Sequence, residues 1–161
     1  MIVVSNTSPI LNLSTIGQLD ILRHLYERVL VPETVLEELR AIQAERDQPE
    51  HLPAHPWLEV RAVADRRLLD ALGAELDRGE AEAIVLALEV SADLLLVDER
   101  KARAVASRHG LICVGLLGVL LEAKRHGIMP SVKAALDGLI VEAGFWVSAR
   151  LYARVLEEAG E

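Results

Sequence analysis

Short, continuous apolar runs alternate with longer segments of helical character, and this alternation constrains the fold more than any other feature. Runs that are short, rich in Val, Leu and Ile, and bounded by polar residues or proline are typical of buried strands. They lie at residues 2–5, 28–32, 92–98 and 111–115, and a further strand is plausible at 58–63. Because helices separate the strands, we predict an α/β fold, a three-layer α/β/α sandwich with a mostly parallel sheet.

The segments between these strands carry the signals that start and stop helices. Ser8 can cap the first helix and Pro9 suits its first turn, while glycines close the helices in the last third of the chain. The proline-rich run at 47–57 is predicted to be an exposed loop. The predicted helices cover residues 8–16, 18–26, 32–45, 65–76, 79–90, 99–110, 116–127, 131–144 and 145–160. A chain of 161 residues can bury a substantial core, so we expect one domain over residues 1–161.

Charge and composition exclude several classes of protein. The net charge of −8 argues against a general nucleic-acid coat, although a local basic surface beside an acidic site remains compatible with it. The single cysteine, Cys113, lies in an apolar run and is predicted to be a buried small hydrophobe, with no disulfide framework. No signal peptide is visible, and no apolar run approaches the roughly 18 residues of a membrane span. We therefore expect a cytoplasmic protein without a membrane partner.

Two of the predicted strands end in polar residues. The strand at 2–5 runs into Ser5 and Asn6, and the strand at 92–98 ends in Asp98. In open parallel sheets, ligand sites form beyond the carboxyl ends of the strands. These residues are therefore site candidates, although Asp98 could instead, or in addition, cap the helix that follows it.

Helical geometry selects two further acids. In the helix at 79–90, Glu80 lies within the apolar arc, whereas Glu82 lies on the opposite, solvated side. In the helix at 32–45, Glu38 borders the buried face. Glu38 and Glu80 are therefore predicted to point toward a site, and the alternative for each is a partly solvated helix acid.

The four candidates, Asn6, Glu38, Glu80 and Asp98, come from different predicted elements. Carboxylates crowded into one pocket repel one another unless a positive charge joins them. Mg²⁺ or Mn²⁺ is the expected answer, because both prefer oxygen ligands. Carboxylates that hold such ions are a common arrangement for phosphodiester hydrolysis, in which the ion activates water and screens the leaving oxygen.

With these four residues in their predicted elements, the sequence resembles the PIN-domain family, and within it a VapC-like toxin and ribonuclease branch. The resemblance runs from the first residues to about residue 140, in the family's order. It is carried by the segments VVSNTSPILNL, IGQLDILRHLY, VLVPETVLEEL, LDRGEAEAIVLAL, LLLVDERKAR and GLLGVLLEAKRHGIMP. It implies a single PIN-like domain with a parallel sheet and Mg²⁺- or Mn²⁺-dependent ribonuclease activity. It also implies RNA as substrate, an antitoxin protein as partner, and a homodimer.

The family pattern places four acids where this chain has Asn6, Glu38, Glu80 and Asp98, so the resemblance implies that these residues bind the metal and carry catalysis. Ser8 matches a small hydroxyl residue beside the first acid. Asn6 departs from the pattern, because its amide can ligate a cation but brings no charge and cannot act as a base. Three outcomes are open. The site binds metal weakly and cleaves slowly, or another acid such as Glu82 or Glu99 partly compensates, although both are predicted to point outward. The third outcome is a chain that binds without catalysis.

The substrate strand also needs cations and surfaces for its bases. Arg100 and Arg103 follow Asp98 and could meet phosphates, or they could belong to a solvated helix face. Trp57, Phe145 and Trp146 could stack bases, and the alternative is that they pack in the core or an interface. The rival to an enzyme is a catalytically weak or inactive RNA-binding or regulatory protein of PIN shape. A metal-dependent phosphatase is a third reading.

Overall fold

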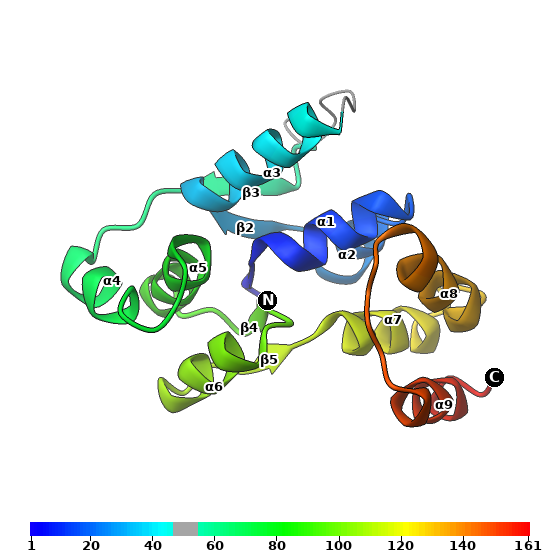
Figure 1. Ribbon diagram of the computed structural model, residues 1–161. Helices are drawn as coiled ribbons and strands as arrows, with labels where there is room; N and C mark the ends of the chain where they lie inside the picture. Colours follow the sequence, from blue (N-terminus) through cyan, green and yellow to red (C-terminus); the bar gives the residue numbers. More distant parts are fainter. Residues whose placement is uncertain (47–54) are drawn as a thin grey trace.

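The computed structural model describes residues 1–46 and 55–161 and contains one five-stranded sheet (Figure 1). All described strand pairs are parallel, and the strand order is β3-β2-β1-β4-β5. The strands are β1 (Val3–Ser5), β2 (Val29–Pro32), β3 (Leu58–Arg61), β4 (Leu94–Leu96) and β5 (Cys113–Val114). The predicted α/β sandwich with a parallel sheet is therefore confirmed.

Helices cover both faces of this sheet. The described helices are α1 (Thr7–Thr15), α2 (Asp20–Tyr26), α3 (Glu33–Glu45), α4 (Arg66–Leu72), α5 (Arg78–Glu89), α6 (Arg100–Arg108), α7 (Leu116–Arg125), α8 (Val132–Glu142) and α9 (Ala149–Glu158). Alternate strand residues enter opposite cores, as the period of two requires. Val3 packs with α1, α2, α7 and α8, whereas its neighbour Val4 packs with α4, α5 and α6.

The strand order reverses between β1 and β4. After β1 the chain builds β2 and then β3 on one side, and α4 and α5 then carry it back to β4 on the other side of β1. The backbone N–H of Asn6 donates to the carbonyl of Leu96 at 3.0 Å, which extends the pairing of β1 with β4. The residues that follow these two strands therefore lie at a topological switch point, where open α/β sheets bind ligands.

Several predicted boundaries differ from the structure. Helix α1 begins at Thr7 with Asn6 in the N-cap position, so Ser8 lies inside the helix instead of capping it. The last predicted helix, 145–160, starts only at Ala149, where the Ser148 hydroxyl accepts from the N–H of Leu151. The residues before it form an extended link, in which Phe145 and Val147 pack against the core. Of the predicted loop at 47–57, residues 47–54 lie outside the described residues.

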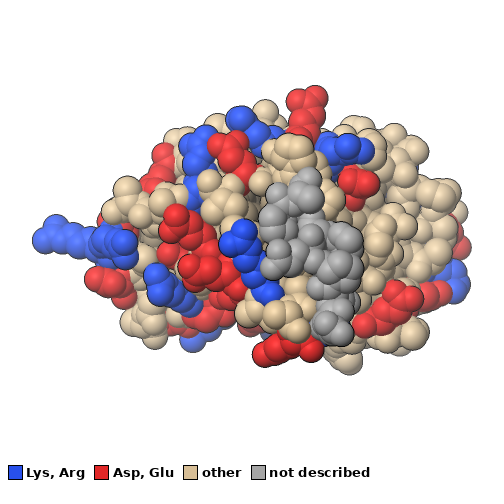
Figure 2. All heavy atoms as spheres, turned by 90° about the horizontal axis from the view of Figure 1, so that it is seen from above, with Lys and Arg blue, Asp and Glu red and all other residues tan. Residues whose placement is uncertain are grey.

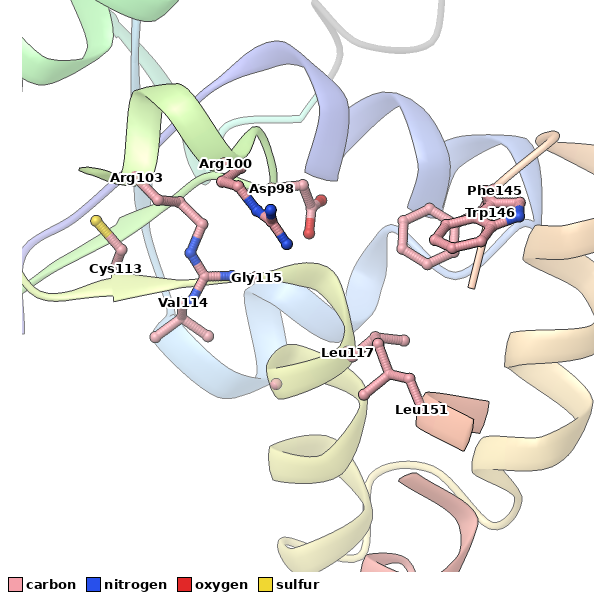
Figure 3. A pocket seen from close by; sticks show the side chains of 11 residues that line it. Asp98, Arg100, Arg103, Cys113, Val114, Gly115, Leu117, Phe145, Trp146 and Leu151 are labelled. Atoms are coloured by element: carbon pink, nitrogen blue, oxygen red, sulfur yellow. The ribbon is translucent and has the colours of Figure 1, made fainter. Parts of the chain in front are cut away.

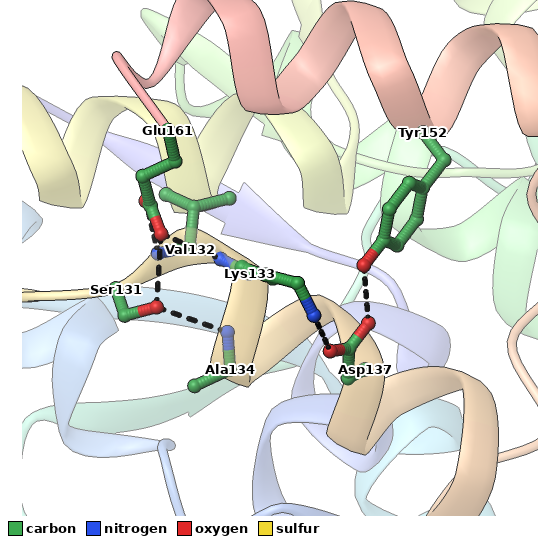
Figure 4. A network of polar contacts seen from close by, with 7 residues as sticks. All are labelled: Ser131, Val132, Lys133, Ala134, Asp137, Tyr152 and Glu161. Carbon is green, nitrogen blue, oxygen red and sulfur yellow. Dashed lines mark hydrogen bonds and ion pairs between the residues drawn. The ribbon is translucent and has the colours of Figure 1, made fainter.

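A polar network fixes α9 against α8 (Figure 4). The carboxylate of Glu161 accepts from the N–H groups of Val132 and Lys133 and from the Ser131 hydroxyl, and so caps α8. Desolvation pushes the pKa of Glu161 up, but these hydrogen bonds and the charge of Lys124 outweigh it and lower the pKa to about 2. The network joins the start of α8 to the residue that ends the chain after α9, and so fixes against each other the two helices that flank a link described below.

No helix in the described ranges is both long and apolar enough to pass through a membrane.

Candidate functional site

A pocket of about 350 Å³ opens at the carboxyl end of β1, and we call it the acidic pocket. It is lined by the β1–α1 junction, α1, α3, the link between α4 and α5, and the starts of α5 and α6. Its polar lining consists of Asn6, Thr7, Ser8, Glu38, Glu75, Asp77, Glu80, Glu99 and Lys101. Carboxylates thus outnumber the one cation, and the pocket carries a negative charge.

Asn6 and Glu38 form one wall of the acidic pocket. Asn6 is 7% exposed, because the pairing of β1 with β4 continues through its backbone. The hydroxyl of Thr7 donates a hydrogen bond to Oε2 of Glu38 and so orients this carboxylate. Gly79 of α5 lies directly against it, since a Cβ at residue 79 would stand 2.6 Å from Oε1 of Glu38. The position of Glu38 therefore depends on a glycine in a different helix.

Glu80 also lines the acidic pocket and belongs to a capping box. Its backbone N–H donates to Oδ1 of Asp77 at 2.8 Å, and the N–H of Asp77 donates back to Oε1 of Glu80 at 3.2 Å. Oε2 of Glu80 is buried and has no hydrogen-bond partner among the described residues. Burial, with the neighbouring Asp77 side chain, raises the pKa of Glu80 to about 7.

Asp98 lies at the end of β4 and faces a second, adjoining pocket of about 650 Å³. Its Oδ1 accepts the N–H of Leu116 at 2.7 Å, so Asp98 caps the first turn of α7, and Glu99 holds the N-cap position of α6. Oδ2 is buried without a partner in the described part of the chain. Burial raises the pKa of Asp98, while the Leu116 amide and the charge of Arg103 oppose the rise. The alternative that Asp98 caps the following helix is wrong.

The structure thus divides the predicted site residues between two neighbouring pockets. Asn6, Ser8, Glu38 and Glu80 line the acidic pocket, whereas Asp98, Arg100 and Arg103 line the second one. Within residues 1–46 and 55–161, no three Asp, Glu, His or Cys side chains stand close enough to hold one metal ion. Each candidate carboxylate accepts a hydrogen bond from its own partner: Glu38 from Thr7, Glu80 from Asp77 and Asp98 from Leu116.

The sequence comparison assigns the fold to a known family. A family model described as a PIN domain matches residues 2–161, which is nearly the whole chain. The chain belongs to the PIN-domain family. PIN domains are generally nucleases, and they generally use divalent metal ions. Comparisons with curated proteins and with solved structures found no significant match.

The ligand atoms that the candidate residues of this PIN domain offer are of the type that a hard divalent cation prefers. All the candidate ligands offer oxygen, which Mg²⁺ and Mn²⁺ prefer. Glu80 and Asp98 each keep one buried oxygen that bonds to nothing in the described residues, and such an atom costs free energy until it finds a partner. A cation would supply that partner. Because the carboxylates do not converge as they stand, binding requires that their side chains rotate toward one another.

Glu82 is a buried acid that the sequence reasoning placed wrongly on the solvated side of its helix. It is 7% exposed, because residues 81–87 of α5 are all buried between the sheet and the neighbouring helices. A helix projection assumes one solvated face, and α5 has almost none. The near absence of polar residues between Glu82 and Glu89 was the available signal, since a helix that is apolar all round is a buried helix.

Replacing Glu82 by glutamine is expected to stabilise the metal-free PIN domain. Oε2 of Glu82 is buried with no hydrogen-bond partner in the described ranges, and relief of an unpaired buried carboxylate is worth about 1–3 kcal/mol. Urea unfolding in EDTA at pH 7.5 measures the difference. The exposed Glu37→Gln on α3 is the control and should change the unfolding free energy little. A less stable Glu82→Gln protein would show that this carboxylate has a stabilising partner.

Proposed function

We propose that this PIN domain is a divalent-cation-dependent endoribonuclease whose activity is attenuated by Asn6. One observation carries the proposal: an acidic pocket at the switch point of the sheet, with a buried Glu80 oxygen that bonds to no described residue. An oxygen-lined pocket of this kind suits a hard cation, and the fold is of the nuclease type.

In this proposal, each residue of the site has a separate role in binding the cation or in catalysis. Glu38, Glu80 and Asp98 would hold Mg²⁺ or Mn²⁺, and Asn6 would add a neutral amide oxygen. Thr7 keeps the carboxylate of Glu38 turned inward through its hydroxyl. When bound, the cation lowers the pKa of water and neutralises charge on the phosphodiester. Glu38 or Glu80 orients the attacking water, and Asn6 cannot act as a base.

The phosphates of the RNA strand need positive partners outside the acidic pocket. Arg100 and Arg103 line the adjoining pocket and supply guanidinium groups, which bind phosphate in a bidentate manner. Ser8 is exposed at the lining of the acidic pocket and offers a hydroxyl to the same strand. We assign these three residues to substrate binding.

The resemblance to the VapC-like branch supports a more specific role. We propose that the chain is the toxin of a toxin–antitoxin pair, acting in the cytoplasm as a homodimer that an antitoxin protein restrains. Expression of the chain alone should then slow growth, and co-expression of a short neighbouring gene with a DNA-binding motif should relieve the effect. Growth unaffected by the chain, with active RNA cleavage in vitro, would contradict the toxin role alone.

The second candidate function is an RNA-binding or regulatory protein with little or no catalysis. It is favoured by two observations: the uncharged Asn6 stands where the family pattern has an acid, and no three described metal-binding side chains converge. RNA binding without cleavage in Mn²⁺ would decide for this candidate.

Cleavage of single-stranded RNA in Mn²⁺, compared with EDTA, tests the proposal, and Glu80→Gln is the decisive variant. Glutamine can keep the capping box with Asp77 but loses the charge, so cleavage should fall at least about a hundredfold while the helix start is preserved. The pKa of Glu80 is about 7 in the folded protein and about 4.5 in the unfolded chain. Ionisation of Glu80 above pH 4.5 therefore favours the unfolded chain.

The pH dependence of stability separates a catalytic effect from misfolding. The stability of the parent protein should fall, relative to Glu80→Gln, as the pH rises from about 4.5 to above 7, since only the parent ionises there. Thermal melts at pH 5 and pH 8 in EDTA measure this difference. Equal cleavage by both proteins would refute the assignment of Glu80.

A further inference from the structure

The second pocket has a cationic wall and an aromatic wall, the two kinds of surface on which proteins bind single-stranded nucleic acids. Figure 3 shows Arg100 and Arg103 of α6 on one side and Phe145 and Trp146, from the link between α8 and α9, on the other. The volume is about 650 Å³ and Leu117 adds apolar surface. A cationic wall facing an aromatic one is the arrangement that binds a phosphate and a base together.

The side chain of Trp146 is exposed to solvent and does not pack in the core. It is 83% exposed, whereas the other tryptophan of the chain, Trp57, is 8% exposed. Its neighbours Phe145 and Val147 turn inward and pack against the core, and the N–H of Phe145 donates to the carbonyl of Leu139 at 3.0 Å. Alternation along an extended segment therefore fixes the indole on the outside. The exposed indole lies beside the apolar Leu117 and Leu151 in the lining of the same pocket, and its flat face is accessible for stacking.

Arg100 and Arg103 lie one helical turn apart and are both exposed. Neither forms an ion pair with a described residue, whereas Arg108 of the same helix pairs with Glu75 at 2.9 Å. Gly115 allows Arg103 to approach Asp98, since a Cβ there would stand 2.9 Å from Nη1 of Arg103 and 3.0 Å from Oδ1 of Asp98. On the face shown in Figure 2, basic and acidic side chains are interspersed. Arg100 and Arg103 therefore bring positive charge to the second pocket without a described carboxylate paired to either of them.

The start of α6 joins this pocket to the acidic one. Asp98 and Arg100 line the second pocket, while the intervening Glu99 and the next residue, Lys101, line the acidic pocket. A chain of phosphates that crosses the start of α6 would therefore pass from the arginines to the acidic pocket.

We propose that this second pocket binds one nucleotide of single-stranded RNA, with the base stacked on Trp146 and the phosphate held by Arg100 and Arg103. The proposal rests on the proposed function for its substrate class and adds to it the means by which the strand is positioned. The bound nucleotide sets the register, so that a neighbouring phosphodiester reaches the acidic pocket.

The chemistry of the pocket favours RNA over a protein partner. An apolar helix of a partner would cover Trp146 and Leu117 but would strip water from two guanidinium groups without giving them acceptors, which costs free energy. A nucleotide brings a flat ring for the indole and phosphate oxygens for the guanidinium groups at the same time.

Binding is measured without metal, so that cleavage plays no part. The variant Trp57→Phe leaves Trp146 as the sole tryptophan, because the chain has two. Its fluorescence is titrated in EDTA with a ten-nucleotide single-stranded RNA that cannot pair with itself. Stacking of a base on the indole should quench the emission, and the anisotropy of labelled RNA gives the affinity.

Three variants test the assignment. Trp146→Ala should weaken binding at least about fivefold, and Trp146→Phe should recover most of the loss, because base stacking needs an aromatic face. Arg100→Ala and Arg103→Ala should each weaken binding and reduce the dependence of log Kd on log salt by about 0.7. Arg108→Ala, on the same helix but outside the pocket, is the matched control and should leave the affinity nearly unchanged.

The outcomes separate this proposal from the nuclease assignment. RNA binding that depends on Trp146 without any cleavage in Mn²⁺ would support the subsite and refute the nuclease. Cleavage with an affinity indifferent to Trp146 and both arginines would refute the subsite and leave the nuclease intact. If Trp146→Ala leaves RNA affinity unchanged and instead changes the sedimentation of the protein, the pocket is a protein interface and the proposal fails.

Discussion

Replacing Asn6 by aspartate is expected to raise the affinity of the acidic pocket for Mn²⁺ at least about tenfold and to increase RNA cleavage. The added carboxylate attracts a divalent cation at close range, and one such charge pair is worth a few kcal/mol at an effective dielectric near 20. The backbone of residue 6 stays in place, because its N–H is bound to the carbonyl of Leu96. Isothermal calorimetry with Mn²⁺ measures the affinity.

The same substitution should destabilise the metal-free protein. Residue 6 is nearly buried, and a carboxylate there would lie in one pocket with Glu38 and Glu80 and be repelled by both. The melting temperature of Asn6→Asp should therefore be lower than that of the parent in EDTA and should rise more on addition of Mn²⁺. Asn12→Asp, within the helix that Asn6 precedes but outside the pocket, is the control. An unchanged Mn²⁺ affinity would show that residue 6 is not a ligand.

The fold was predictable because its signals are local. Runs such as 92–98 and 2–5 are apolar on both sides, which is typical of strands covered by helices on both faces, and the helices between them carry their own start and stop residues. The acids of the acidic pocket could also be selected, because a strand end and a helix projection each use only neighbouring residues. Glu38 and Glu80 do line one pocket.

The orientation of the carboxylates depends on contacts between distant residues, and these cannot be read from periodicity. Asp98 turns toward Leu116, eighteen positions along the chain, and Thr7 turns Glu38. The capping box at Asp77 and Glu80 was visible in the sequence, since an acid at the N-cap and a glutamate three residues later form its signature. Glu82 was misplaced for a physical reason: its burial depends on what packs around α5, not on its own helix.

Gly79→Ala is expected to reduce RNA cleavage about tenfold to a hundredfold while leaving the protein folded. The new methyl group would meet Oε1 of Glu38 at 2.6 Å and Oε2 at 3.0 Å, so the carboxylate must move away. A catalytic group displaced by about 1 Å can cost about a hundredfold in rate. The side chain of Glu38 can swing aside at little cost, and alanine in a helix is favoured over glycine by up to about 1 kcal/mol. Activity and stability should thus change in opposite directions.

Cleavage rates in Mn²⁺ and thermal melts in EDTA measure the two effects on one protein. Gly138→Ala is the matched control, because Gly138 also lies inside a helix but its new Cβ would meet only Ile16, at an ordinary 3.4 Å. That variant should cleave RNA as the parent does. If Gly79→Ala cleaves RNA at the parent's rate, Glu38 does not act from the place that Thr7 and α5 give it. A loss of both folding and activity would mean that α5 cannot yield at residue 79, and that the glycine serves helix packing.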